Sequence, residues 1–196
     1  GTNLTTATAG AVEYDGKVIY STPNGRGVSP SMMFYRLNSA SAGSNATGAQ
    51  SIYGVGVTLV ASTVYVFDGS WILQKTAGTT SHTISVLFGG TATLNNIGYW
   101  GSSARVDSAG SSAVGASPVV GYNTTASALA WTGAITSAAE TLSIRICGTV
   151  SINTGGTFIP QYQLSAAPGG AYSTLTGASF AIWPIGAAGA LSLIHI

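Results

Sequence analysis

The stretch "TLSIRICGTVSI", residues Thr141–Ile152, alternates apolar and polar side chains. Leu142, Ile144 and Ile146 fall at every second position, so in a β-strand they share one face. The opposite face carries Ser143, Arg145 and Cys147. This alternation predicts a strand with one face in a core. Arg145 is then either exposed to solvent, which we favour, or paired with a carboxylate across a subunit interface.

Eight further stretches are rich in β-branched and aromatic residues and are separated by Gly, Ser and Asn clusters. They are Ile52–Val60, Thr63–Gln74, His82–Phe88, Leu94–Tyr99, Val119–Tyr122, Leu129–Ile135, Thr157–Leu164 and Ser179–Trp183. No stretch shows the 3.6-residue period of an amphipathic helix. So many short strands at short spacing predict an all-β fold, and we expect a jelly-roll-type antiparallel β-sandwich.

The segment "VEYDGKVIY" predicts a short β-hairpin connector before the sandwich. An Asp-Gly pair, Asp15-Gly16, lies between two β-rich runs and is typical of a two-residue hairpin turn, which would place Tyr14 opposite Lys17. The turn-rich "STPNGRGVSP" that follows marks a boundary. We therefore expect a connector or stem over residues 1–36, a sandwich head over 37–186, and a Gly/Ala spacer with a foreign tail over 187–196.

The composition limits the classes of partner. Charged residues make up 6% of the chain against about 25% in ordinary soluble domains, and the net charge is +1. No cluster of Lys and Arg offers a footprint for nucleic acid or an anionic membrane, and no apolar run of about 18 residues predicts membrane insertion. The single cysteine, Cys147, cannot form an internal disulfide. We expect no cofactor.

Catalytic residues are not predicted. A glycan-cleaving site needs two converging carboxylates, and each of the five candidates has a structural explanation. Asp15 is interpreted as a turn residue, Asp68 as part of a turn or bulge, and Glu140 as the start of a strand. The other two are Glu13 in the hairpin and Asp107 in a loop. His82 shares a strand face with apolar residues, so a strand-end or interface role is favoured over a catalytic triad. No spacing of ligands predicts a metal site.

Non-covalent binding is the better candidate. "GSSARVDSAGSSAVGASP", residues 101–118, reads as a long surface loop, and aromatic residues beside it could stack on sugar rings. The predicted receptor-binding residues are Tyr99, Trp100, Arg105 and Tyr122. For Trp100 taken alone, a place in the core or in a trimer contact is favoured over a role in binding.

The segment "AGAVEYDGKVIYSTPNGRGV", residues 9–28, resembles the connector of phage and prophage tail-fibre proteins. "TVSINTGGTFIPQYQLSAAPGG", residues 149–170, and "SFAIWPIG", residues 179–186, are similar to the closing strands of the C-terminal heads of those fibres. These heads in turn resemble trimeric jelly rolls of the complement and tumour-necrosis-factor type. The resemblance supplies no catalytic residues.

What the resemblance implies is a homotrimeric head within a virion, assembled in a bacterial host cytoplasm beside other virion proteins. Its expected function is host attachment by binding a surface glycan or protein without covalent chemistry. One alternative is a capsid decoration or fibre-cap protein with no receptor. A second, disfavoured by the few carboxylates, is a glycan depolymerase.

The two ends of the chain carry separate interpretations. Because it begins at Gly1 without Met, we read it as a piece of a longer protein. The last six residues, "LSLIHI", match what one reading frame of sequencing-adapter DNA would encode, as in a metagenomic read-through; the alternative is a genuine terminal strand. His195 is for that reason not counted as chemistry.

Overall fold

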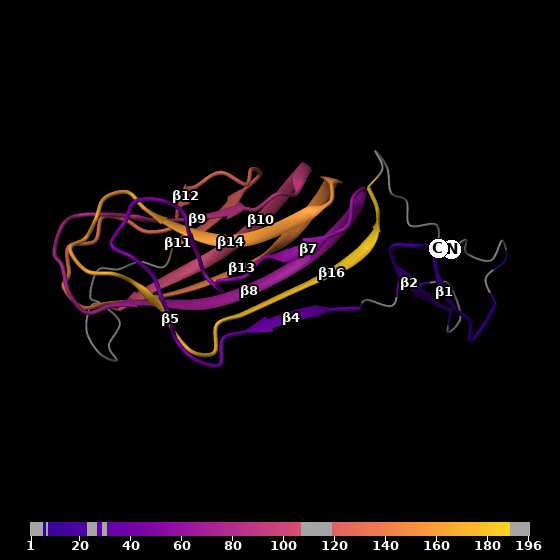
Figure 1. Ribbon diagram of the computed structural model, residues 1–196, viewed down its shortest axis with the longest axis horizontal. Coiled ribbons are helices and arrows are strands. Elements are labelled where there is room, and N and C mark those ends of the chain that lie inside the picture. The colour runs from indigo at the N-terminus through magenta and orange to yellow at the C-terminus, as the bar shows by residue number, and fades with distance from the viewer. Residues whose placement is uncertain (1–5, 7, 23–26, 29–30, 107–118, 189–196) are drawn as a thin grey trace.

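The computed structural model describes residue 6 and residues 8–22, 27–28, 31–106 and 119–188 (Figure 1). Within these ranges the regular elements are β-strands. The described residues include no helix that is long and apolar enough to cross a bilayer. Parts of the segments quoted above lie outside the described ranges. They include Arg26 in the connector, Asp107 and the rest of the predicted loop up to 118, and residues 189–196 with His195.

The larger sheet of the sandwich is built on three long antiparallel neighbours in the order β10-β13-β8. Their bounds are Thr63–Lys75 for β8, Thr93–Val106 for β10 and Glu140–Thr154 for β13. Strand β11, Val119–Asn123, pairs with the edge of β10 that β13 leaves open. Beyond β8 lie β16 (Ser179–Ala187) with β4 (Met33–Arg36), and β15 (Ser173–Thr174) with β5 (Ser41–Ala42).

The smaller sheet has the order β12-β9-β14-β6, with β7 also paired to β14. Its strands are β6 (Gln50–Ser51), β7 (Val57–Leu59), β9 (Ile84–Gly89), β12 (Leu129–Ala130) and β14 (Gly156–Leu164). The chain crosses between the two sheets from β8 to β9 to β10, and again from β12 to β13 to β14 (Figure 1). The predicted all-β, antiparallel sandwich of the jelly-roll type is confirmed.

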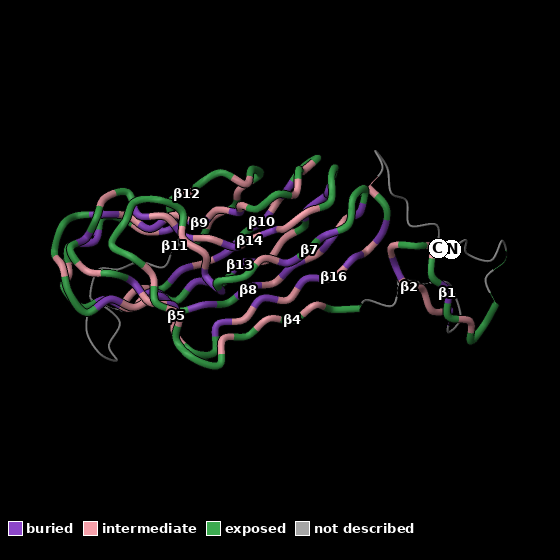
Figure 2. The backbone as a smooth tube through the Cα atoms, in the orientation of Figure 1, coloured by how far each residue is buried: buried purple, intermediate pink, exposed green. Residues whose placement is uncertain are grey.

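The core fills the space between the two sheets with aromatic side chains. Buried and less buried residues alternate along the strands, as the tube in Figure 2 shows. Phe67 on β8 is fully buried, and its ring centroid lies 5.2 Å from that of Phe88 on β9 and 5.9 Å from that of Phe180 on β16. Phe88 stacks on Phe158 at 4.7 Å. These contacts join both sheets through one cluster.

Pairing with neighbours makes two strands longer or more regular than composition predicts. The segment Gly101–Val106, expected as the start of a loop, continues β10 because β11 and β13 pair with it on both sides. A Cβ on Gly101 would lie 2.3 Å from the Arg145 carbonyl oxygen, so this close approach requires glycine. Asp68, expected in a turn or bulge, lies in the middle of β8 opposite Cys147, where the pairing has no shift.

The predicted strand Ile52–Val60 is broken. Only Gln50–Ser51 and Val57–Leu59 are paired as strands, as β6 and β7. Between them Gly54 has a φ of +71°, a left-handed conformation that ends the extended backbone. In an unbroken strand Tyr53 and Val55 would share one face, but here Tyr53 is buried whereas Val55 is 54% exposed.

The hairpin connector is present, but its turn is longer than expected. The connector sheet consists of β1 (Val12–Tyr14), β2 (Ile19–Ser21) and β3 (Gly27–Val28). Tyr14 pairs with Ile19 rather than with Lys17, so four residues form the turn. Asp15 explains the difference, because its Oδ1 accepts hydrogen bonds of 2.8 Å from the backbone N–H groups of both Lys17 and Val18.

The connector sheet lies at one end of the sandwich, on the right in Figure 1. The Lys17 Nζ donates a 2.8 Å hydrogen bond to the carbonyl oxygen of Ser62, in the turn before β8. The larger sheet includes β4, whose Met33 pairs with Ile182, so paired sandwich strands begin four residues before the expected start of the head at residue 37.

We expect Phe67→Ala to lower the free energy of unfolding by about 3–5 kcal/mol, because it removes a fully buried ring at the junction of both sheets. Urea denaturation followed by tryptophan fluorescence measures this change. Thr149→Ala, at an exposed position of β13, is the control and should change stability by less than about 0.5 kcal/mol. A loss below about 1 kcal/mol for Phe67→Ala would contradict the assignment of this cluster as the core.

Candidate functional site

Two exposed aromatic residues stand side by side on the outer face of the larger sheet. Trp100 on β10 and Tyr122 on β11 are directly paired across the two strands, and they are 59% and 78% exposed. Paired residues on one face have Cβ atoms about 4.5–5.5 Å apart, so the two rings are neighbours. Val120, also on β11, is 72% exposed and extends the group. We call Trp100, Tyr122 and Val120 the aromatic platform.

Tyr99, predicted as a third member of the binding surface, is instead part of the core. It is only 3% exposed, and its ring packs against Phe88 at 5.2 Å and Trp131 at 6.3 Å between centroids. Its hydroxyl accepts a 3.0 Å hydrogen bond from Asn123 Nδ2. Burial raises the pKa of Tyr99. Successive residues of a strand point to opposite faces, so Tyr99 and Trp100 could not both have belonged to one surface.

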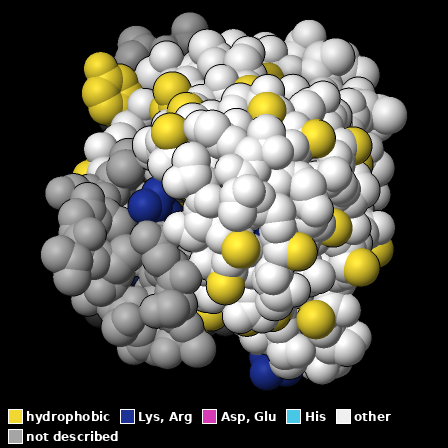
Figure 3. All heavy atoms as spheres, turned by 90° about the vertical axis from the view of Figure 1, so that its left-hand side faces the viewer, with side chains coloured by type: hydrophobic (Ala, Val, Ile, Leu, Met, Phe, Trp, Pro, Cys, Tyr) yellow, Lys and Arg dark blue, Asp and Glu magenta, His cyan; other side chains and the backbone are white. Residues whose placement is uncertain are grey.

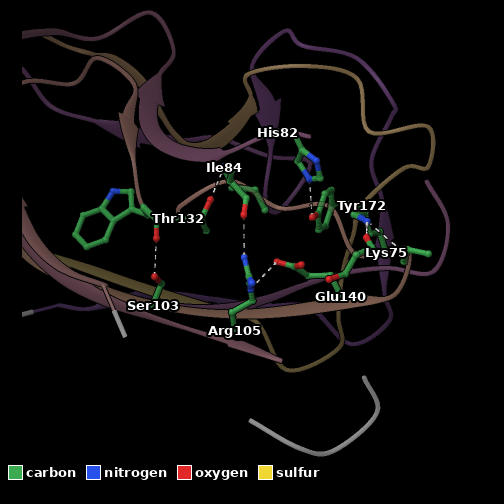
Figure 4. Close-up of polar contacts among 12 residues, drawn as sticks. Lys75, His82, Ile84, Ser103, Arg105, Thr132, Glu140 and Tyr172 are labelled. Carbon is green, nitrogen blue, oxygen red and sulfur yellow. Dashed lines mark hydrogen bonds and ion pairs between the residues drawn. The ribbon is translucent and has the colours of Figure 1, made fainter. Parts of the chain in front are cut away.

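Arg105, the fourth predicted residue, also points away from the aromatic platform. It lies on the same face of β10 as Tyr99, and Figure 4 shows it inside the end of the sandwich. Its terminal nitrogen donates to the Ala134 carbonyl oxygen at 3.2 Å, and its Nε lies 4.0 Å from Glu140 Oε1. The four predicted residues therefore separate into two exposed side chains and two interior ones.

A cluster of buried polar groups closes the end of the sandwich where β8 ends (Figure 4). Lys75, the last residue of β8, is 1% exposed. Its Nζ donates to the carbonyl oxygens of Gly78 at 2.9 Å and Ala138 at 3.2 Å, and also to that of Ser137. Glu140, the residue paired with Lys75 across the strands, is 2% exposed. Lys75 thus holds together the loops that leave β8 and enter β13.

His82 and Tyr172 belong to the same cluster. His82 Nδ1 lies 2.8 Å from the Thr80 carbonyl oxygen, which can only accept, so Nδ1 carries the proton. Nε2 then accepts from the Tyr172 hydroxyl at 2.9 Å. Burial, and after it the positive charge of Lys75, lower the pKa of His82 against the opposing effect of Thr80. Burial and the charge of Glu140 raise the pKa of Tyr172.

These contacts give the polar cluster a structural role. Its groups are directed at backbone carbonyls and at one another, and Lys75, His82, Glu140 and Tyr172 are all 2% exposed or less. The sequence interpretation missed Lys75 and Tyr172, although Lys75 continues the inward positions of β8 set by Phe67, Trp71 and Leu73. This position was the signal that could have predicted the cluster. A lysine at an inward position among apolar residues must find hydrogen-bond acceptors inside the protein.

The carboxylates of the described residues do not converge on one site. Asp68 lies on the outer face of β8 and binds Arg145 of β13 through a 3.3 Å ion pair, with side chains 40% and 72% exposed. Arg145 is therefore exposed, as favoured, and pairs within its own chain. Asp15 lies in the connector turn, whereas Glu140 lies in the buried cluster. Among the described residues no group of three or more potential ligands is positioned to hold a metal ion.

The described surface at the end of the sandwich opposite the connector offers no group of large exposed side chains like the aromatic platform. Figure 3 faces this end and shows single hydrophobic side chains scattered among polar and backbone atoms, with little Lys or Arg. Scattered apolar residues of this kind are normal on a protein surface. The aromatic platform, where neighbouring strands place large exposed side chains together, is a stronger candidate for binding.

Comparisons with known proteins do not assign a family. No protein-family model matches the chain, and no curated protein matches it. Among solved structures, a chain of "Structure of infectious bursal disease virus Gx strain" is similar over 90% of this chain and 45% of that chain, with 10% identity and a TM-score of 0.19. This chain thus covers less than half of that viral chain, and a score so low supports no conclusion about fold or function.

We expect the stability of the protein to fall as the pH drops below about 6.5, the ordinary pKa of histidine. The folded state depresses the pKa of His82, so it binds fewer protons than the unfolded state, and stability present above pH 6.5 is lost towards the folded-state pKa. One such group changes the unfolding free energy by at most about 1.4 kcal/mol per pH unit. Urea denaturation between pH 7.5 and 5 measures the slope.

His82→Gln should flatten this slope, and it should lower stability at pH 7.5 by about 1–3 kcal/mol through loss of the buried hydrogen bonds. The matched control is His195→Gln, which changes the other histidine of the chain. If His195→Gln removes the slope and His82→Gln does not, the assignment to His82 is wrong.

Proposed function

We propose that this chain is the head of a virion attachment protein, and that its aromatic platform binds a host-surface glycan without covalent chemistry. The observation that carries the proposal is the exposed pair Trp100 and Tyr122 on neighbouring strands. The placement in a phage fibre rests on the resemblance of the connector and the closing strands to tail-fibre proteins. Homotrimeric assembly and contact with other virion proteins belong to the same proposal.

The aromatic platform has the chemistry that sugar recognition needs. An aromatic ring offers a flat apolar face to the C–H groups of a sugar, and the indole N–H of Trp100 and the hydroxyl of Tyr122 add polar contacts. Neither side chain is required by the core, because both point to the outer face of the sheet and most of their surface is exposed. The fold of a single chain does not explain why these two rings are exposed, whereas binding of a ligand would.

A second candidate is a structural decoration or fibre-cap role without a receptor. It is favoured by exposed apolar side chains at the connector end, where Val12, Tyr14 and Val60 are 73%, 56% and 50% exposed. Contacts with other virion chains would cover these residues. The two candidates differ in one consequence, because only the attachment protein loses host binding when the aromatic platform is altered.

We expect Trp100→Ala and Tyr122→Ala each to weaken binding to host cells or to an arrayed glycan by about five- to tenfold, equivalent to about 1–1.4 kcal/mol. The labelled protein is assayed for adsorption to bacterial cells and for binding to a glycan array, with size-exclusion chromatography to verify that the oligomer is intact. The matched control is Ile72→Ala, which removes another exposed apolar side chain from the outer face of the same sheet.

Unchanged binding by the Trp100→Ala/Tyr122→Ala double variant would contradict the attachment function. Loss of the oligomer in Trp100→Ala would instead identify Trp100 as an assembly contact. Because both side chains are largely exposed, each substitution should leave the unfolding free energy within about 0.5 kcal/mol of the parent.

A further inference from the structure

The aromatic platform is one end of a row that crosses the whole outer face of the larger sheet. The paired positions connect β11, β10, β13, β8, β16 and β4 without a shift in register. In this order the row consists of Tyr122, Trp100, Cys147, Asp68, Ala181 and Phe34. Phe34, at the far end, is a third exposed aromatic residue, with 57% of its surface open to solvent.

The row is long and narrow. Neighbouring strands lie about 4.8 Å apart, so the five steps from Tyr122 to Phe34 span about 24 Å. Between the aromatic residues at the two ends stand the small side chains of Cys147 and Ala181 and the ion pair of Asp68 with Arg145. A ligand that contacts both ends must therefore be extended and must run across the strands.

Polar groups that suit sugar hydroxyls flank the row. The adjacent row on one side has Ser102, Arg145, Ser70 and Ser179 at successive paired positions. On the other side the exposed Thr149 is paired between Gly98 and Val66, so the row is less polar on this side. Hydroxyl groups both donate and accept hydrogen bonds, and the exposed Arg145 and Asp68 add a strong donor and a strong acceptor.

The charge and shape of the row favour a glycan chain over a protein partner. The core of a protein interface is apolar and depleted in charge, whereas an exposed ion pair occupies the centre of this row. That pair is also neutral overall, with Arg145 and Asp68 3.3 Å apart, so the centre of the row offers no net charge to an ionic ligand. An uncharged sugar chain can form hydrogen bonds with the exposed ion pair and does not need a net charge on the row.

We infer that the row binds one linear, uncharged glycan chain that lies across the strands, with the aromatic platform at one end and Phe34 at the other. This inference rests on the proposed function and extends it, because it assigns the ligand a minimum length and a second contact. A terminal monosaccharide or disaccharide would use the aromatic platform alone. An extended chain of about 24 Å would use both ends.

The test measures affinity against ligand length. The probes are defined oligosaccharides of two to eight sugars from amylose, dextran, cellulose and linear mannan, with hyaluronan fragments as charged counterparts. Isothermal titration calorimetry on the intact protein gives each dissociation constant at low and high salt. We expect at least one neutral series to bind, with an affinity that rises about tenfold or more from the shortest to the longest member and does not change with salt.

Phe34→Ala should remove most of this gain with length while leaving the affinity for the disaccharide unchanged. Trp100→Ala should weaken short and long members alike, and Ile72→Ala should affect neither. Phe34→Tyr keeps an aromatic ring on β4 and should retain the gain with length, which separates stacking from a folding defect of this edge strand.

Each other outcome overturns the inference. If Phe34→Ala binds long chains as tightly as the parent protein, or if only hyaluronan binds, the row does not hold an uncharged chain. In either case, reduced cell adsorption by Trp100→Ala would still support the attachment function. If no neutral series binds at all, the inference fails. If the Trp100→Ala/Tyr122→Ala double variant adsorbs normally to cells, the proposed function fails independently of glycan length.

Discussion

The side chains of β8, β10 and β13 alternate between the two faces of one sheet, and the other features of the molecule depend on this alternation. The inward positions include Phe67, Trp71 and Ile146, each fully buried. The outward positions of the same strands include Trp100, Asp68 and Arg145. A shift of one residue in any pairing would exchange the two sets and expose the core. Both sides of β13 are paired over nearly its full length, which holds the register.

The two ends of the sandwich are held by different means. At the connector end, contact is made through the Lys17 side chain and the Ser62 carbonyl oxygen. At the opposite end the loops converge on Lys75, Glu140, His82 and Tyr172. Placing a lysine and a glutamate inside is costly unless a donor or acceptor of the right kind compensates each of them for the lost water. Lys75 donates to backbone carbonyl oxygens and Glu140 lies 4.0 Å from Arg105 Nε, and these contacts position the loops around them.

The outer face of the larger sheet is not constrained by the core, and its residue content is therefore informative about function. Trp100, Tyr122 and Phe34 would expose less apolar surface if they were replaced by Ser or Thr, so the fold of one chain does not account for their exposure. Their alignment on one row is a property of the pairing register. The absence of a matching family model leaves this surface, together with the resemblance of the connector, as the basis for the proposed function.

Much of the fold was accessible from the sequence because alternation is local. The strands Thr63–Gln74, Thr141–Ile152 and Thr157–Leu164 were predicted within a few residues of β8, β13 and β14. The Ser/Gly-rich end of β10 was not, because its strand state depends on pairing with β11 and β13 rather than on its own composition. The length of the connector turn was missed because the Asp15 side chain, not the Asp-Gly pair alone, determines it.

The sequence by itself determined that the chain is an antiparallel β-sandwich with a hairpin connector, and that adjacent residues such as Tyr99 and Trp100 point to opposite faces. Only the tertiary structure decided which of these two faces the core, that Arg105 meets Glu140, and that Trp100, Tyr122 and Phe34 share a row. The physical reason is the distance along the chain over which each property is determined. The period of a strand is set by its own backbone, whereas its face and register are set by contacts between residues far apart in the chain.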